Sequence, residues 1–141
     1  METRSVPAVL ESLAEIRRFV KDAAGRARIE DSRTYQLQLA VDEIATNIIL
    51  YGYKDAGEGA VISIGAERTG DALVITLKDQ SPPFDPRTMQ MPEATDLAMP
   101  LEERKVGGLG IYLAFQGVDR FEYCHKDGYN LNIFEVRSGH D

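Results

Sequence analysis

The chain has 141 residues, with 23 acidic against 16 basic residues and a formal net charge of -7. This length fits a single domain over residues 1–141, built around one hydrophobic core. The acidic balance argues against direct nucleic-acid binding, because phosphate contacts rely on clustered lysine and arginine. No stretch approaches the roughly 20 apolar residues of a membrane span. The single cysteine, Cys124, allows no internal disulfide, which fits a reducing compartment, so we expect a cytoplasmic protein. We expect Cys124 itself to be buried.

The N-terminal region predicts a strand followed by a helix. Residues 2–6 are expected to form an edge strand. Pro7 suits the first turn of a helix over 8–24, in which apolar residues recur every three or four positions. Gly25 is the predicted end of this helix, because glycine is common just after a helix C-terminus.

The segment Thr34–Tyr53, TYQLQLAVDEIATNIILYGY, predicts a second helix, capped by Asp31 or Ser32. Glu43 and Asn47 lie one turn apart on the border of its apolar stripe. Such a pair suits a site in which one side chain accepts a proton and the other holds a cation through its amide oxygen. The same spacing is also common among ordinary boundary residues of half-exposed helices.

Four segments rich in β-forming residues predict two hairpins. Residues 60–68 and 72–80 form the first, and residues 120–126 and 129–137 form the second. An Asp-Gly turn joins the second pair. With the helices between them, this order predicts an α/β two-layer sandwich, in which helices cover one face of a mixed, mostly antiparallel sheet.

Two further chemical signals flank a long loop over residues 80–106. Asp79 ends a strand, where it could accept a hydrogen bond from an exocyclic amine such as that of adenine. Aspartate before a proline-rich turn is also ordinary turn chemistry. A third helix begins at Gly107, Gly108 and Gly110, whose backbone N–H groups could approach a phosphate, although such glycines often form only a tight loop.

In this order, the motifs resemble the ATP-binding fold of gyrase, histidine kinases and MutL, known as the GHKL or Bergerat fold. VDEIATNIILYGY is similar to the N box of that superfamily, DQSPPFDP to its first glycine box and GGLGIYL to its second. The short strand and helix before the N box favour the branch of small anti-sigma-factor serine kinases of the RsbW and SpoIIAB type. The resemblance covers nearly the whole chain.

The resemblance implies a role for each of these residues. Asn47 would coordinate the Mg²⁺ that bridges the phosphates of ATP or ADP, and Asp79 would recognise adenine. Glu43 would be the general base toward a serine or threonine hydroxyl of a partner protein. The phosphate end of the pocket would be lined by the three glycines of the second box, Gly107, Gly108 and Gly110.

The loop over about 85–106 would be the ATP lid, with Arg104 and Lys105 as phosphate contacts. Two positions depart from the family pattern. Ser81 stands where the first glycine box normally has a glycine, so the approach of the backbone to adenine is altered. The family often has a threonine beside adenine before the final strand, where this chain has Tyr129, Asn130 and Asn132, and Asn130 is the predicted substitute.

The resemblance implies an ATP-dependent serine/threonine kinase that phosphorylates a STAS-fold anti-sigma factor antagonist, sequesters a sigma factor and forms a homodimer. A second interpretation keeps the nucleotide pocket without catalysis, leaving a regulatory module that acts by partner sequestration. Glu43 favours the enzyme, because a pocket without catalysis needs no base, whereas Ser81 slightly favours the module. A two-layer domain without any ligand is the third interpretation.

Overall fold

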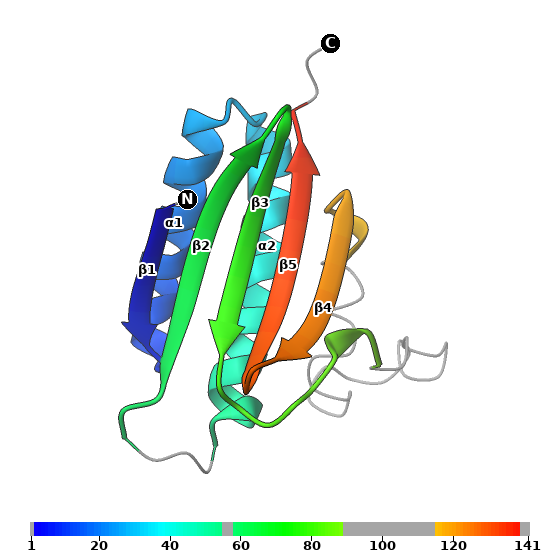
Figure 1. Cartoon of the computed structure of the whole chain (residues 1–141). Coiled ribbons are helices and arrows are strands. Elements are labelled where there is room, and N and C mark those ends of the chain that lie inside the picture. The colour runs from blue at the N-terminus through cyan, green and yellow to red at the C-terminus, as the bar shows by residue number, and fades with distance from the viewer. Residues whose placement is uncertain (1, 55–57, 89–114, 139–141) are drawn as a thin grey trace, which may run out of the picture.

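The computed structural model describes residues 2–54, 58–88 and 115–138. Within these ranges the chain forms two layers, a β-sheet and a pair of helices packed against one of its faces (Figure 1). The predicted two-layer α/β sandwich is therefore confirmed.

The sheet has five strands in the order β1-β2-β3-β5-β4. Every pairing between neighbouring strands is antiparallel. The expectation of a mostly antiparallel sheet thus holds throughout the described strands. Their bounds are β1 (Glu2–Pro7), β2 (Val61–Thr69), β3 (Ala72–Asp79), β4 (Arg120–Lys126) and β5 (Tyr129–Arg137).

The helical layer lies behind the sheet in Figure 1. A 3-10 turn, η1 (Leu10–Ser12), leads into α1 (Leu13–Arg26), and α2 (Asp31–Asn47) runs on into a π-helical turn, η2 (Ile48–Gly52). The predicted third helix falls largely outside the described residues. Its described end, residues 115–116, is helical.

The core lies between the two layers, because strands and helices each bury one face. Strand residues alternate between faces, so every second side chain of β3 and β5 points toward the helices. The helices meet them with residues spaced three or four apart. The fully buried large side chains at this contact are Ile16, Val20, Leu37, Val41, Ile62, Ile64, Ile75, Leu77, Phe134 and Val136.

The ends of α1 differ from the sequence expectation. Pro7 is the last residue of β1 rather than part of the helix, and α1 continues past Gly25 to Arg26. The helix ends where Arg28 adopts a left-handed φ of 58° and the Ile29 N–H donates to the Ala24 carbonyl oxygen at 3.0 Å. This hydrogen bond is that of a Schellman motif. An arginine thus takes the position at which glycine was expected.

The start of α2 and the outer sheet face also differ in detail. Asp31 is the first residue of α2 and Glu30 precedes it as N-cap, without a side-chain capping bond. Cys124 lies on the edge strand β4 and is exposed, so the prediction of a buried cysteine is wrong.

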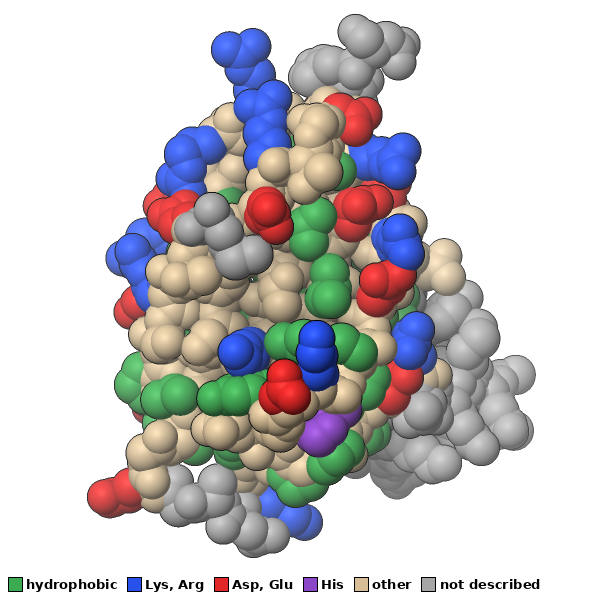
Figure 2. Space-filling model, viewed as in Figure 1, with side chains coloured by type: hydrophobic (Ala, Val, Ile, Leu, Met, Phe, Trp, Pro, Cys, Tyr) green, Lys and Arg blue, Asp and Glu red, His purple; other side chains and the backbone are tan. Residues whose placement is uncertain are grey.

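Figure 2 shows the sheet face away from the helices, where hydrophobic side chains alternate with charged ones. Among the described residues, no helix is long and apolar enough to cross a membrane.

Candidate functional site

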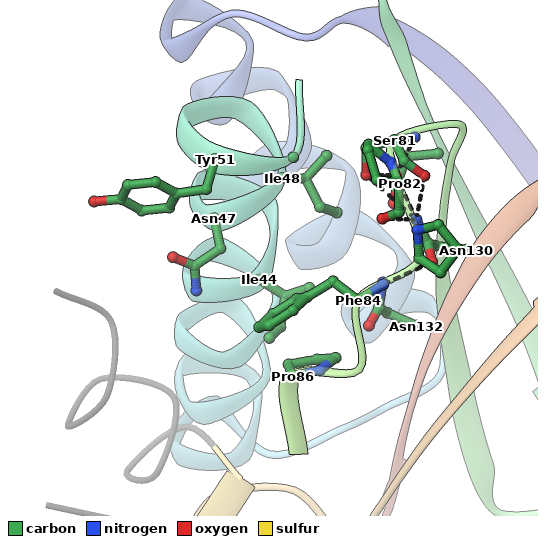
Figure 3. Close-up of a pocket in the computed structure, with 13 residues that line it drawn as sticks. Ile44, Asn47, Ile48, Tyr51, Ser81, Pro82, Phe84, Pro86, Asn130 and Asn132 are labelled. Atoms are coloured by element: carbon green, nitrogen blue, oxygen red, sulfur yellow. Dashed lines mark hydrogen bonds between the residues drawn. The ribbon is translucent and has the colours of Figure 1, made fainter. Parts of the chain in front are cut away.

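A cavity of about 430 Å³ opens between the end of α2 and the sheet (Figure 3). The helix contributes one side, the ends of β3 and β5 contribute the opposite side, and the proline-rich segment after β3 closes it. Apolar and polar groups both line it: Ile44, Asn47, Ile48, Tyr51, Gly52, Asp79, Ser81, Pro82, Pro83, Phe84, Pro86, Asn130 and Asn132.

The N box supplies the helical side of the cavity. Ile44 and Ile48 continue the buried stripe of α2 into the cavity, and Asn47 also lines it. The Asn47 Nδ2 atom is buried and has no hydrogen-bond partner. An unpaired amide in this position costs stability unless a ligand completes its bonding.

Glu43 lies one turn before Asn47 and is half-buried, outside the set of residues that line the cavity. Burial raises the pKa of the Glu43 carboxyl group above its usual value, and the nearby Asp42 carboxylate raises it further. A carboxylate with a raised pKa holds a proton more readily, which is what a general base needs.

Asp79 is the most buried polar residue of the cavity, with 1% of its surface exposed. Three donors converge on its Oδ1 atom: the Ser81 N–H at 2.9 Å, the Ser81 hydroxyl, and Asn130 Nδ2 at 3.1 Å. Its Oδ2 atom is buried without any partner. One carboxylate oxygen is therefore fixed by the protein, and the other remains an acceptor for a ligand.

Ser81 occupies the position at which the first glycine box normally has a glycine. Its side chain is buried and donates to Asp79, on the far side of the carboxylate from the free oxygen. The space for this hydroxyl comes from Gly52 at the end of η2, because a Cβ atom there would lie 2.8 Å from Ser81 Oγ. Ser81 therefore orients the carboxylate instead of filling the cavity.

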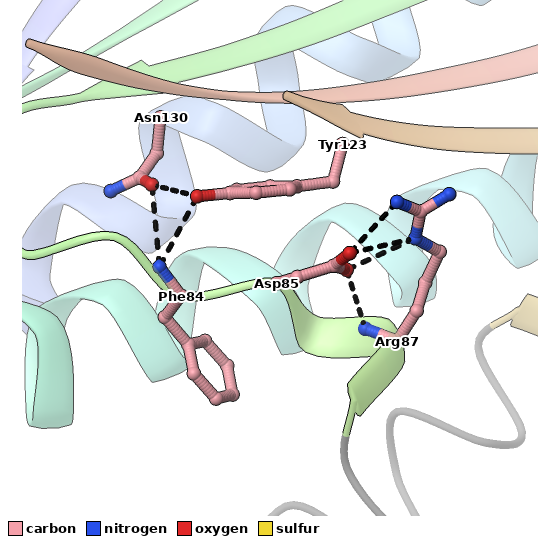
Figure 4. Close-up of polar contacts among 5 residues, drawn as sticks. All are labelled: Phe84, Asp85, Arg87, Tyr123 and Asn130. Carbon is pink, nitrogen blue, oxygen red and sulfur yellow. Dashed lines mark hydrogen bonds and ion pairs between the residues drawn. The ribbon is translucent and has the colours of Figure 1, made fainter. Parts of the chain in front are cut away.

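Asn130 holds the segment that follows β3. Its Nδ2 atom donates to the Ser81 carbonyl oxygen at 2.9 Å and to the Pro82 carbonyl oxygen at 3.3 Å. Its Oδ1 atom accepts hydrogen bonds from the Tyr123 hydroxyl and from the Phe84 N–H (Figure 4). Both ends of this amide are engaged within the protein, and its predicted contact with adenine stays a prediction.

Asn132 was not among the predicted site residues. It lies two residues after Asn130 on β5, so the same strand alternation that buries Phe134 turns it toward the helices. It is 3% exposed, lines the cavity, and its Oδ1 atom is buried without a partner. The signal available in the sequence was an amide at an inward position of a strand that is otherwise apolar on that face.

Tyr53, the last residue of the N box, joins the end of η2 to β2 and to the residue after β3 through hydrogen bonds. Its hydroxyl donates to the Val61 carbonyl oxygen at 2.9 Å and accepts from the Gln80 N–H at 2.6 Å. Burial raises the pKa of this hydroxyl. The residue after Asp79 is thereby fixed relative to the end of the helix that carries Asn47.

These groups suit a purine nucleotide with its metal ion. The free Asp79 Oδ2 can accept from an exocyclic amine, and the apolar side chains of Ile44, Ile48 and Phe84 can cover a flat ring. The described residues contain no cluster of three or more acidic, histidine or cysteine side chains for a metal ion. Mg²⁺ often takes few protein ligands together with substrate phosphates, so a single amide oxygen from Asn47 fits that pattern.

Comparison with known proteins agrees with this chemistry. The histidine kinase-like ATPase domain family matches residues 6–133. The chain belongs to this family. The histidine kinase-like ATPase domain described here is 30% identical over 128 residues to the serine-protein kinase RsbW of Bacillus cereus, covering 89% of this chain and 78% of that protein. The predicted resemblance to GHKL proteins and to RsbW-like kinases is confirmed.

Solved structures show the same fold at low sequence identity. A structure of the RsbU and RsbW domains of a Mycobacterium tuberculosis protein has a TM-score of 0.61 at 15% identity, covering 97% of this chain and 32% of that one. The Acinetobacter baumannii histidine kinase AdeS has a TM-score of 0.52 at 11% identity, covering 99% of this chain and 70% of that one.

Half of the predicted site of this ATPase domain lies in the described residues. The structure brings Asn47, Asp79, Ser81 and Asn130 together around one cavity, with Glu43 beside it. The remaining predicted residues lie outside the described ranges, together with most of the predicted lid over 85–106. These residues are Arg104, Lys105, Gly107, Gly108 and Gly110.

Proposed function

We propose that this chain is an ATP-dependent serine/threonine kinase of the anti-sigma-factor type. One observation carries the proposal: a fully buried aspartate, Asp79, has one oxygen saturated by the protein and the other free in an apolar cavity next to the N box. Adenine offers its 6-amine to such an acceptor; guanine has an amine as well, at C2, and the match to the histidine kinase-like ATPase domain family favours adenine. In guanine and hypoxanthine the corresponding position is a carbonyl oxygen, which an acceptor repels.

In this mechanism, Asp79 accepts from the exocyclic amine of adenine, and Ile44 and Ile48 pack against the ring. Asn47 offers its amide oxygen to Mg²⁺, which neutralises charge on the phosphates when bound. Asp79 and Asn47 come from opposite sides of the cavity, so the protein holds the base and the phosphates of one nucleotide at once. This arrangement lowers the barrier by positioning rather than by covalent chemistry.

Glu43 acts as the general base. It takes the proton of a partner's serine or threonine hydroxyl as that oxygen bonds to the γ-phosphorus and the bond to the β-phosphate oxygen breaks, leaving ADP. The raised pKa of Glu43 supports this role, because a base works best when its pKa approaches the working pH.

The protein substrate in this proposal is a STAS-fold anti-sigma factor antagonist, and a homodimer of the kinase sequesters a sigma factor. The support is similarity to relatives named serine-protein kinase RsbW. A second candidate is a nucleotide-binding module that sequesters its partner without phosphorylating it. The position of Glu43 outside the cavity lining favours that candidate.

Calorimetry with ATP, with and without Mg²⁺, and phosphotransfer to a STAS-fold protein of the same organism test the proposal. Asn47→Ala should lose the Mg²⁺-dependent part of ATP affinity. Glu43→Gln should keep ATP affinity and lose phosphotransfer by a factor of about 10² or more.

Glu67→Gln is the matched control, because this carboxylate is exposed on β2, away from the cavity lining, and should keep full transfer. Full transfer by Glu43→Gln would exclude Glu43 as the base. ATP binding by the wild type without transfer to any STAS protein would favour the sequestering module. Wild-type protein that binds no adenine nucleotide would refute both candidates.

A further inference from the structure

We propose that Asn132 is a specificity-determining residue that contacts the base of the bound nucleotide. The inference rests on the proposed function, since it concerns the ligand of the same cavity. No family motif and no step of the proposed phosphotransfer assigns a role to this residue.

Asn132 is buried with its amide oxygen unpaired. Only 3% of its surface is exposed, and its Oδ1 atom has no hydrogen-bond partner. A buried amide oxygen that bonds to nothing destabilises the folded protein, so its presence calls for a partner that the chain itself does not supply.

Asn130, the other amide on the same face of β5, differs from Asn132 in its bonding. Asn130 bonds to Asp79 and to the main chain of the segment after β3, so it has a structural task. Asn132 shares its burial and its strand, but its Oδ1 atom has no hydrogen-bond partner. Of the two amides, Asn132 is the one available to a ligand.

Asn132 also lies near Asp79, on the neighbouring strand. In the sheet register Asp79 pairs with Asn130, and Asn132 pairs with Leu77, one inward-facing step further along the same two strands. Both side chains line the cavity on the side opposite Ile44 and Ile48. A planar ring that gives its amine to Asp79 and packs on the two isoleucines turns an edge toward Asn132.

The chemistry of this contact follows from what an amide can do. An amide carries a donor and an acceptor side by side, and rotation of the group interchanges them. Adenine carries the matching pair, its amine hydrogen and a ring nitrogen, on each of its two polar edges. We assign the Asn132 amide to one of these edges, where its Oδ1 atom accepts one amine hydrogen and its Nδ2 atom donates to the adjacent ring nitrogen, while Asp79 accepts the other amine hydrogen.

The test compares wild type with Asn132→Leu, which keeps the size of the side chain and removes its polar atoms. The ATP Kd, measured by calorimetry, should rise about tenfold in the variant, the loss expected for hydrogen bonds between neutral partners. The melting temperature without nucleotide should rise by about 3 °C, because a buried unpaired amide is gone. A residue kept for structure would give a lower melting temperature instead.

Base analogues identify the contact. Wild type should bind 7-deaza-ATP or 1-deaza-ATP about tenfold more weakly than ATP, because one of them lacks the ring nitrogen that Asn132 meets. Asn132→Leu should show no further loss with that analogue, since the partner is already absent. Thr76→Val is a polar-to-apolar change of similar size on the outer face of β3. It should leave the affinities for ATP, 7-deaza-ATP and 1-deaza-ATP as they are in wild type.

Several results would overturn the inference. The first is an Asn132→Leu variant that binds ATP as tightly as wild type. The second is a loss of affinity with each deaza analogue that is as large in Asn132→Leu as in wild type. If the leucine variant does not fold, Asn132→Ala takes its place in the same comparison. Wild type that binds no ATP at all would instead refute the proposed function, so the two failures are distinguishable.

Discussion

Gly52 and Ser81 lie so close together that a side chain at position 52 would overlap with Ser81. In Gly52→Ala the new Cβ atom would lie 2.8 Å from Ser81 Oγ and 3.0 Å from Ser81 Cβ. The next atom, Ile48 Cγ2, is 3.8 Å away, which is an ordinary contact. The Ser81 hydroxyl cannot simply turn aside, because it donates to the buried Asp79 carboxylate. Gly52→Ala should therefore lower the free energy of unfolding by about 1–3 kcal/mol, the usual cost of overpacking.

Removing the other partner should cancel this cost. Ser81→Gly takes away both atoms that lie within 3.0 Å of the new methyl group, at its own cost of about 1–3 kcal/mol for a lost hydrogen bond to a carboxylate. In the Ser81→Gly background, Gly52→Ala should be neutral or stabilising by about 0.5 kcal/mol, because alanine reduces the entropy of the unfolded chain. The expected coupling energy between the two sites is about 1–3 kcal/mol.

Urea unfolding of wild type, both single variants and the double variant, followed by far-UV circular dichroism, measures this coupling. Gly25→Ala in α1 is the matched control, since a Cβ atom there meets nothing within 4 Å. That control should stabilise the protein by about 0.5–1 kcal/mol. Additive effects of the two substitutions, within about 0.5 kcal/mol, would show that Gly52 and Ser81 are not in contact and would refute the explanation given for Ser81.

Two further predictions concern Tyr53 and Glu43. Tyr53→Phe should lower the free energy of unfolding by about 1–2 kcal/mol, because the Gln80 N–H and the Val61 carbonyl oxygen lose their common partner; an unchanged urea midpoint would contradict this. Because burial and Asp42 raise the pKa of Glu43, phosphotransfer should fall with decreasing pH from a point above the usual glutamate pKa of 4.5, as the base becomes protonated. The phosphotransfer rate that remains in Glu43→Gln should not show this fall at low pH. If the rate falls at the same pH in both proteins, another group is responsible.

Local patterns in the sequence were sufficient for most of the fold. The alternation of apolar residues in β2, β3 and β5 reflects burial of one sheet face, which needs no knowledge of distant contacts. The Asp127-Gly128 turn was predicted correctly for the same reason. Both residues take left-handed φ values, 54° and 84°, as the tight hairpin requires.

The end of α1 shows where such local reasoning fails. Gly25 was expected to end the helix, yet the left-handed position belongs to Arg28, three residues later. The buried Ile29 that follows packs in the core, which fixes the place at which the chain must leave the helix. Tertiary packing thus outweighs the preference of arginine for other backbone angles.

Motifs in the sequence named residues of the candidate site, but not which of their polar atoms the protein itself engages. Sequence motifs pointed to Asp79 and Asn130, and the structure places both at one cavity. Which amide is engaged by the protein depends on the path of the segment after β3, which no local pattern describes. Asn132 was missed for that reason, and the mutual fit of Gly52 and Ser81, 29 positions apart, could not be inferred either.

The number of residues in the π-helical turn at the end of α2 determines how the side chains near the site are oriented. This turn is closed by the Tyr53 N–H, which donates to the Ile48 carbonyl oxygen at 2.9 Å, and it holds one residue more than an α-helical turn. Loss of a single residue between Asn47 and Tyr53 would rotate the remaining side chains of this turn by about 100° around the helix axis relative to Asn47. Related sequences that keep each motif but differ by one residue in this turn should therefore be treated as having a different nucleotide site.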